Sequence, residues 1–256
     1  MNNNKKFSII VITLNTKKDF LKTINSVLSQ KYSHYELIVV DGNSADGTIE
    51  EINKLKKKFS KIIIGKDKGI YDAMNKGIRF INNDWVIFLN SGDIFYNKDV
   101  LKKINSEIHL KKKIDVLVGR NIVGSKIKYY SKFKKINSKT FKSVFSHQSV
   151  FFRSSLFLKK KYNLKFKIAA DFEFFKYLIK KNKRFYYTDI IFSLSKIGGI
   201  SDRNRVLALN EFYMIAQNYN NNTLAVLIEY IFNYIFLFLT KFIKLISPKK
   251  LNLLIL

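Results

Sequence analysis

Four polar segments of the sequence contain Asp, Asn, Gly and Ser, residue types that bind polar ligands and also form tight turns. Each segment directly follows a short apolar run rich in β-branched residues. The segments are Thr13–Asn15, Asp41–Thr48, Lys66–Gly77 and Asn90–Asp93. Turn and helix-cap chemistry explains any one of them. Because the same change of composition follows four successive runs, the pattern indicates that the segments form one site.

Carboxylates give these segments their chemistry. An Asp at the end of a strand can accept hydrogen bonds from a nucleotide base or from ribose hydroxyls, and a second Asp can bind a hard divalent cation that neutralises a diphosphate. The sequence contains neither of the glycine-rich motifs, G-x-G-x-x-G and G-x-x-x-x-G-K-[ST], that hold phosphates through backbone amides. The pattern therefore favours a nucleoside diphosphate leaving group held by side chains and a cation.

The four apolar runs are predicted strands, at Ser8–Leu14, Glu36–Val40, Lys61–Ile64 and Trp85–Leu89. The residues between them have helical spacing: one helix is expected to begin at Thr16, a second at Ser44 or Asp46, and a third to span Ile70–Ile81. This alternation predicts an α/β fold with a mostly parallel sheet and helices on both faces. Ligands bind such sheets beyond the carboxyl ends of the strands, where the four polar segments lie.

The alternation weakens beyond about residue 110. Further strands are predicted at Val116–Gly119, Lys126–Tyr130 and Ser149–Phe152, and a helix at Asp171–Lys181. We expect the sheet to become antiparallel in this second half and to build an acceptor site there. The predicted catalytic domain is 1–218, with a donor half of about 1–100 and an acceptor half of about 101–218, and residues 219–256 form a C-terminal tail.

The C-terminal tail is apolar and aromatic over Thr223–Ile246. Eighteen helical residues, Thr223–Thr240, would reach only about 27 Å, which is short for a membrane span. The spacing of the polar residues places them on one face of a helix: Glu229, Asn233, Lys241 and Lys244. This predicts an amphipathic helix in a membrane interface, with lysines at anionic headgroups. A subunit or domain contact and a spanning helix are the alternatives.

The formal net charge is +28, and most of the excess is lysine spread along the chain. The stretch Lys126–Lys142 has seven lysines and no acidic residue. It is interpreted either as a solvated loop or as a patch facing anionic lipid or an anionic substrate. Nucleic-acid binding is not predicted, because the familiar binding motifs are absent from the sequence. With no cysteine, and with Phe7–Ile12 interpreted as a strand and not an export signal, we expect a cytoplasmic protein, peripheral on the cytoplasmic face of the inner membrane.

Taken together, the motifs resemble those of the family 2 glycosyltransferases, enzymes of the GT-A fold. The resemblance covers about residues 7–200, and its motifs are Ser8–Asn15, Leu37–Ser44, Asp46–Thr48, Asp67–Gly77, Trp85–Asp93, His147–Arg153 and Ala170–Glu173. It implies a Rossmann-like central sheet, a nucleotide-sugar donor and inversion at the anomeric carbon. It also implies a glycan or lipid-linked acceptor in the synthesis of bacterial surface polysaccharide.

The resemblance assigns donor-binding roles to Thr13, Asn15, Asp41, Lys68, Asp72, Asn75 and Ser91. The first three would hold the nucleotide base and ribose, and the next three would lie near the base or the diphosphate. Asp93 matches the last acid of the family's D-x-D motif, the ligand of a divalent cation, Mn²⁺ or Mg²⁺. Asn90 and Gly92 stand where some members have carboxylates, so a single acid of this motif remains.

Asp171 matches the family's general base, which takes the proton of the acceptor hydroxyl. Glu173 lies about 200° further round the same predicted helix, so we do not expect the two acids to act as a close pair. His147 and Gln148 are assigned to the acceptor side, and Tyr71 is interpreted as core or pocket wall with no chemical role. The competing hypotheses are a catalytically inactive relative that binds a nucleotide-sugar or glycan, and a basic adaptor at a membrane surface or on nucleic acid.

Overall fold

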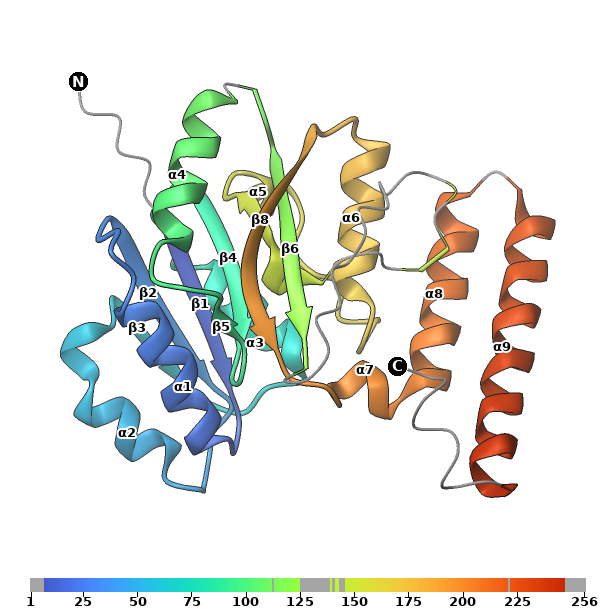
Figure 1. Cartoon of the computed structure of the whole chain (residues 1–256), viewed down its shortest axis with the longest axis horizontal. Coiled ribbons are helices and arrows are strands. Elements are labelled where there is room, and N and C mark those ends of the chain that lie inside the picture. Colours follow the sequence, from blue (N-terminus) through green and yellow to red (C-terminus); the bar gives the residue numbers. More distant parts are fainter. Residues whose placement is uncertain are drawn as a thin grey trace.

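The computed structural model describes residues 7–111, 113–124, 139, 141–142, 146–220 and 222–246, and only the backbone of 241–246. The strands within these residues are β1 (Phe7–Thr13), β2 (Tyr35–Asp41), β3 (Lys61–Ile64), β4 (Trp85–Asn90), β5 (Ile94–Phe95), β6 (Val116–Val123), β7 (Val150–Arg153) and β8 (Phe185–Ser195). They form one sheet in the order β3-β2-β1-β4-β7-β6-β8-β5 (Figure 1).

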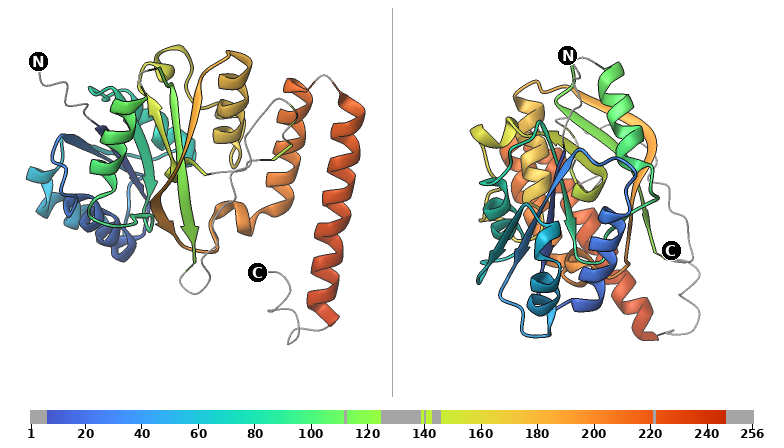
Figure 2. Two further views of the ribbon diagram at one scale, coloured as in Figure 1. Left: turned by 45° about the horizontal axis from the view of Figure 1, so that its top comes forward. Right: turned by 90° about the vertical axis from the view of Figure 1, so that its left-hand side faces the viewer.

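The helices of the same residues are α1 (Lys17–Leu28), α2 (Thr48–Lys54), η1 (Lys56–Lys58), α3 (Ile70–Ile78), α4 (Val100–Leu110), η2 (His147–Ser149), α5 (Leu156–Lys159), α6 (Ala170–Lys180), α7 (Ile200–Arg203), α8 (Arg205–Tyr219) and α9 (Thr223–Ile246). Helices cover both faces of the sheet (Figure 2). Alternate residues of β1 enter different cores: Ile10 packs with α3 and α6, and Ile9 packs with α1 and α4. The predicted α/β sheet, covered on both faces, is therefore present.

The first four strands run parallel, as predicted, and each lies within about two residues of its predicted range. Their register aligns the polar segments, because Thr13 pairs with Asp41 across β1 and β2, and Ile12 pairs with Asn90 across β1 and β4. The carboxyl ends of three strands consequently meet at one edge of the sheet, which is where the candidate site lies.

The sheet becomes partly antiparallel in its second half. Strand β7 is antiparallel to β4 and β6, and β5 is antiparallel to β8, but β6 and β8 run parallel. Gly119 permits the last pairing, since a Cβ at this position would lie 2.4 Å from Cε1 of Phe192. Strand β8 and helix α4 were not predicted. The predicted strand Lys126–Tyr130, and most of the basic stretch Lys126–Lys142, lie outside the described residues.

The two long helices α8 and α9 lie side by side at one end of the molecule (Figures 1 and 2). Val226 of α9 joins Leu209 and Ala216 of α8 in a small core of their own. The other apolar side chains of residues 223–240 are mostly exposed, including Phe232 at 70% and Phe236 at 57%. Among the described helices, α9 alone is long and apolar enough to cross a membrane, over Thr223–Thr240 with a mean hydropathy of 1.8.

Candidate active site

The turn after β2 forms a closed set of hydrogen bonds around a buried carboxylate. Asp41 is fully buried, and its two oxygens accept hydrogen bonds from the amide and the hydroxyl of Ser44, both at 2.7 Å. The Ser44 hydroxyl in turn accepts the amide of Asn15 at 2.8 Å, and the Asn15 side chain accepts the amide of Ala45 at 2.8 Å. Asn15 has a φ of 50°, a conformation that Asn tolerates better than most residues. These bonds fix the ends of β1 and β2 against each other.

Thr13 ends β1 within the same group of residues and is buried. Its hydroxyl contacts the hydroxyl of Thr16 at 3.1 Å. Thr16 does precede α1, as predicted, but its side chain makes no capping bond to the helix. At the start of α2 the cap position is Gly47 and not the predicted Ser44 or Asp46; Asp46, one residue earlier, accepts the amide of Thr48 at 3.1 Å.

The loop after β3 contains an ion pair that sequence reasoning missed. Asp67 pairs with Lys76 of α3 at 2.6 Å. Asp67 also lies close to the β2 turn, since a Cβ on Gly42 would come within 2.9 Å of its Oδ2 atom. Asp72 accepts the backbone amide of Lys68 at 3.0 Å and lies 3.7 Å from Lys76. Lys68 and Asp72, both predicted to bind the donor, are thus joined to each other, and Asp67 beside Lys68 lies at the β2 turn.

Asn75 connects the two halves of the protein. Its side chain donates to the carbonyl of Tyr162 at 2.9 Å and accepts the amide of Tyr162 at 3.0 Å. These two bonds give Asn75 a structural role, because they hold the segment between α5 and α6 against α3. The prediction that Asn75 also lies near the donor is not tested by them.

The turn after β4 differs from the β2 turn because some of its buried polar atoms have no hydrogen-bond partner among the described residues. Asp93 is buried, and its Oδ2 atom accepts the amide of Asn90 at 3.0 Å. Burial raises the pKa of Asp93, and the nearby His147 acts in the opposite direction. Two further buried atoms, Asn90 Oδ1 and Ser91 Oγ, have no hydrogen-bond partner among the described residues. Gly92 completes the turn with a φ of 103°, which a side chain would strain.

These oxygens are of the kind that a divalent cation binds. Mg²⁺ and Mn²⁺ prefer carboxylate and carbonyl oxygens. Asp93 offers a carboxylate, Asn90 an amide carbonyl oxygen and Ser91 a hydroxyl. The described residues contain no cluster of three Asp, Glu, His or Cys side chains that could hold a metal by themselves. The turn therefore fits a cation whose other ligands come from elsewhere, for instance from a bound diphosphate.

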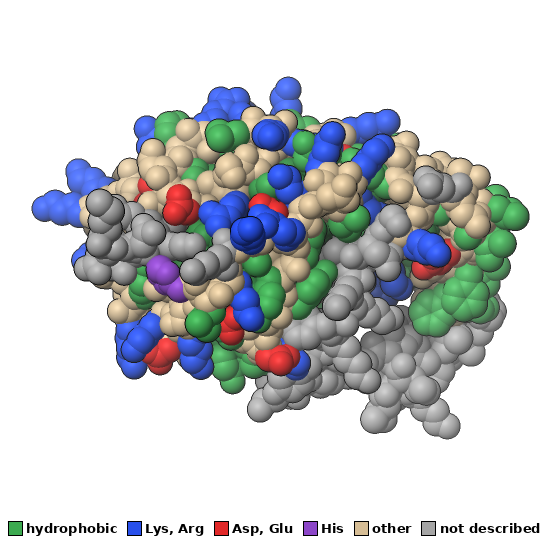
Figure 3. Space-filling model, turned by 90° about the horizontal axis from the view of Figure 1, so that it is seen from above, with side chains coloured by type: hydrophobic (Ala, Val, Ile, Leu, Met, Phe, Trp, Pro, Cys, Tyr) green, Lys and Arg blue, Asp and Glu red, His purple; other side chains and the backbone are tan. Residues whose placement is uncertain are grey.

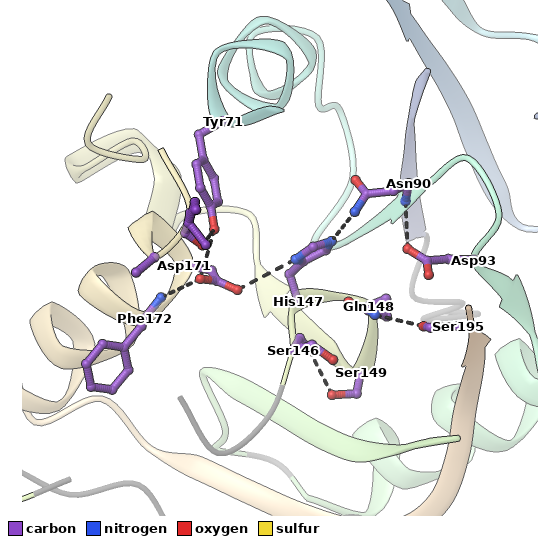
Figure 4. A network of polar contacts seen from close by, with 12 residues as sticks. Tyr71, Asn90, Asp93, Ser146, His147, Gln148, Ser149, Asp171, Phe172 and Ser195 are labelled. Atoms are coloured by element: carbon purple, nitrogen blue, oxygen red, sulfur yellow. Dashed lines mark hydrogen bonds and ion pairs between the residues drawn. The ribbon is translucent and has the colours of Figure 1, made fainter. Parts of the chain in front are cut away.

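His147 bridges the β4 turn and helix α6 (Figure 4). Its Nε2 atom lies 3.0 Å from the side-chain nitrogen of Asn90, and its Nδ1 atom lies 3.6 Å from Asp171 Oδ2. An Asn90 amide that donates to Nε2 leaves the ring proton on Nδ1, facing the carboxylate. The neighbouring Gln148 donates to Ser195 at 2.7 Å, and its own oxygen is buried without a partner among the described residues.

The two oxygens of Asp171 have different surroundings. Oδ1 accepts the amide of Phe172 at 2.8 Å and lies 3.0 Å from the hydroxyl of Tyr71. Oδ2 faces His147 at a distance too long for a hydrogen bond. Burial, followed by the charge of Asp171, raises the pKa of Tyr71 well above its ordinary value, so Tyr71 stays protonated and can donate. Tyr71, which was assigned no chemical role, therefore contacts the predicted base directly.

Glu173 lies on another side of α6. It forms an ion pair with Lys160 and accepts the hydroxyl of Tyr219 at 2.6 Å. None of these groups contacts Asp171 in the described contacts, which agrees with the prediction that the two acids do not act as a pair.

A cation at the end of β8 was also missed. Lys196 pairs with Asp19 of α1, and its Cδ atom lies 3.7 Å from where a Cβ on Gly92 would be. Nothing local in the sequence links residue 196 to the β4 turn, because the contact depends on β8 lying next to β6 and β5.

The sheet is parallel in its first half and partly antiparallel in its second, with polar residues along one edge, and this arrangement is the GT-A fold. The chain belongs to glycosyl transferase family 2, whose model matches residues 8–182. Two solved structures share the fold. TarS 1–349 of S. aureus in complex with UDP-GlcNAc has a TM-score of 0.67 and 22% identity, over 82% of this chain and 64% of that one. Mannosyltransferase PcManGT of Pyrobaculum calidifontis, in complex with GDP-Man and Mn²⁺, has a TM-score of 0.66 and 13% identity, over 85% and 65%.

Two relatives show similarity in sequence. The PGL/p-HBAD biosynthesis glycosyltransferase of Mycobacterium bovis is 29% identical over 172 residues, which cover 66% of this chain and 67% of that protein. The UDP-Glc:alpha-D-GlcNAc-diphosphoundecaprenol beta-1,3-glucosyltransferase WfaP of Escherichia coli is 36% identical over 105 residues, 40% of this chain and 39% of that protein. The predicted fold and family are confirmed, and the chain is a glycosyltransferase by its family.

Proposed function

We propose that this chain transfers a sugar from a nucleoside-diphosphate sugar to a hydroxyl group of an acceptor, with inversion at the anomeric carbon. The observation that carries the proposal is the environment of Asp171. One of its oxygens is held by Phe172 and Tyr71, while Oδ2 is left open beside His147. A carboxylate with one fixed and one open oxygen, at the edge of the sheet where ligands bind, suits a general base.

In the proposed reaction, Asp171 Oδ2 takes the proton of the acceptor hydroxyl as the acceptor oxygen attacks the anomeric carbon. The bond from that carbon to the diphosphate oxygen breaks on the opposite side, and the nucleoside diphosphate leaves with the bonding electrons. A single displacement of this kind inverts the configuration and needs one base. His147 and Gln148 would lie on the acceptor side of the sugar, and the turns of Asp41 and Asp72 would hold the nucleotide.

A divalent cation, Mn²⁺ or Mg²⁺, would be held by Asp93 with the open oxygens of Asn90 and Ser91. When bound it neutralises charge on the departing diphosphate. The Mn²⁺ in the related mannosyltransferase structure supports this proposal. Lys196, beside the same turn, would add positive charge from the protein itself.

The donor and the acceptor are proposed by class. The related structures were solved in complex with UDP-GlcNAc and with GDP-Man. WfaP is named for an acceptor sugar, GlcNAc, attached to diphosphoundecaprenol, a lipid diphosphate. These support a nucleotide-sugar donor and a glycan or lipid-linked acceptor in surface polysaccharide synthesis. The proposed location is the cytoplasmic face of the inner membrane.

The exposed apolar face of α9 supports the membrane part of this proposal. The side turned to α8 carries Val226 and Tyr230, whose hydroxyl donates to Asn210 of α8 at 2.9 Å. Asn233 of α9 accepts a hydrogen bond from Lys142 Nζ at 3.5 Å. The opposite side is lined by large apolar groups such as Phe232 and Phe236. Figure 3 shows hydrophobic side chains gathered at the α9 end, and Lys and Arg scattered over the rest of that face. The apolar surface can be buried in the interface of a bilayer. The net charge of +28 favours a bilayer of anionic lipid.

Sedimentation with phosphatidylglycerol vesicles tests this binding on the full chain. Replacing Phe232 and Phe236 together by Ser, which removes apolar surface without adding charge, should reduce the bound fraction about tenfold, whereas Glu229→Asp, which keeps the charge of the same helix, should leave it unchanged. If the double variant stays bound, α9 is not the anchor. If α9 joins two copies of the chain instead, the double variant will change the oligomeric state in the absence of lipid.

A second candidate function is a catalytically inactive binding protein, which the single acid of the β4 turn favours. A thermal-shift screen of nucleotide-sugars with Mn²⁺ identifies a donor, because a ligand that binds the native state raises the melting temperature. Release of the nucleoside diphosphate from that donor, with no acceptor present, then separates the candidates. Slow hydrolysis that depends on Asp171 supports the transferase, and binding without any hydrolysis supports the inactive relative.

A further inference from the structure

The hydroxyl of Tyr71 has one proton and two acceptors. It lies 2.7 Å from the carbonyl oxygen of Ile168 and 3.0 Å from Asp171 Oδ1. Tyr71 is 5% exposed, so water does not compete freely for this proton. Because the shorter contact is to the carbonyl, the position of Ile168 decides how much of the hydrogen bond Asp171 receives.

Glu211 of α8 fixes the position of Ile168. Its buried carboxylate accepts three consecutive backbone amides, from Lys167 at 2.8 Å, Ile168 at 2.9 Å and Ala169 at 2.8 Å. Hydrogen bonds to an ionised acceptor are stronger than neutral ones. Glu211 thereby holds the segment that leads directly into α6, although it lies beyond the region matched by the family model.

We propose that Glu211 is a positioning residue for Asp171, acting through Ile168 and Tyr71. It keeps the Ile168 carbonyl against the Tyr71 hydroxyl, so that the hydroxyl proton is shared and does not pass wholly to Asp171. A carboxylate that accepts fewer hydrogen bonds is a stronger proton acceptor. The proposal rests on the proposed function in one respect, that Asp171 is the base whose strength matters.

Other titratable groups also face Asp171. His147 of η2 lies 3.6 Å from its Oδ2 atom, and Tyr162, from the segment after α5, interacts with its charge. Neither is bonded to Glu211 in the described contacts, so a change at Glu211 that leaves these groups in place isolates the effect of Tyr71.

The test is an NMR titration of the Asp side-chain carboxyl carbons in the full chain, with the Asp171 signal assigned by its loss in Asp171→Asn. Tyr71→Phe removes a donor and should raise the pH midpoint of this signal by roughly one unit. Glu211→Asp keeps the charge but shortens the side chain by one methylene. It should lower the midpoint when Tyr71 is present and leave it unchanged in the Tyr71→Phe background.

The matched control is Ile215→Val, a fully buried position of the same helix outside these hydrogen bonds, which should not move the midpoint. Equal shifts by Glu211→Asp in both backgrounds, or no shift in either, would overturn the proposal. If Glu211→Asp does not fold, an unchanged midpoint in Tyr71→Phe overturns it alone. Failure of the proposed function gives a different result: Asp171→Asn would then retain full turnover. The titration could still show that Glu211 acts on Asp171 through Tyr71.

Discussion

The turns that follow β2 and β4 have similar compositions and opposite hydrogen-bonding states. In the β2 turn, both oxygens of Asp41 accept bonds from Ser44, and Ser44 accepts the amide of Asn15. In the β4 turn, Asn90 Oδ1 and Ser91 Oγ are buried without partners among the described residues. Buried polar atoms without partners are rare, because each one loses its bonds to water. The comparison separates a turn whose polar atoms bond to one another from a turn whose buried oxygens have no partner among the described residues, as the proposed cation site requires.

The largest effect on stability should come from opening the closed turn. Asp41→Ala removes the acceptor of two buried donors, the amide and the hydroxyl of Ser44, and each unsatisfied donor costs about 1–3 kcal/mol. We expect a loss of about 3 kcal/mol in the free energy of unfolding, measured by urea denaturation. A loss below about 1 kcal/mol would mean that this turn does not support the fold.

Next in size is the effect of cation binding at the open turn. Asp93→Ala should remove the gain in affinity for the nucleoside diphosphate that Mn²⁺ produces, which we expect to be about tenfold, or about 1.4 kcal/mol. Isothermal titration with and without Mn²⁺ measures it. An unchanged gain in the variant would show that the cation binds elsewhere.

The smallest effect is expected from the matched pair of serines. Ser91→Ala should change the free energy of unfolding by no more than about 0.5 kcal/mol, since Ser91 Oγ bonds to nothing among the described residues. Ser44→Ala should cost about 1 kcal/mol, because the Asn15 amide loses its acceptor. If Ser91→Ala proved the more destabilising of the two, the contrast between the turns would be wrong.

How far the sequence predicts this molecule depends on how local each signal is. Strands β1 to β4 are continuous apolar runs, and their positions were predicted closely. Strand β8 was missed because its burial does not alternate: the neighbours Phe192 and Ser193 are both fully buried, and Ile190 and Ile191 are both partly buried. No simple alternation therefore marks it.

The same distinction applies to the site. Asp41, Asp93 and Asp171 lie in motifs that can be recognised along the chain, whereas their partners come from distant elements. Tyr71 is 100 residues from Asp171, and Asn90 is 57 residues from His147. Residue types alone do not identify such pairs, because they depend on which strand ends and helices the sheet brings together.

Kinetics of Asp171→Asn test the central claim most directly, once a donor and an acceptor are in hand. The variant should bind the donor with an affinity within about twofold of the original, and its turnover should fall by roughly 10²–10⁴-fold, as expected for loss of a general base. Glu173→Gln, on the same helix but bonded to Lys160 and Tyr219, should reduce turnover far less. Equal losses of donor affinity and turnover in Asp171→Asn, or a larger loss of turnover in Glu173→Gln, would contradict the assignment of Asp171 as the base.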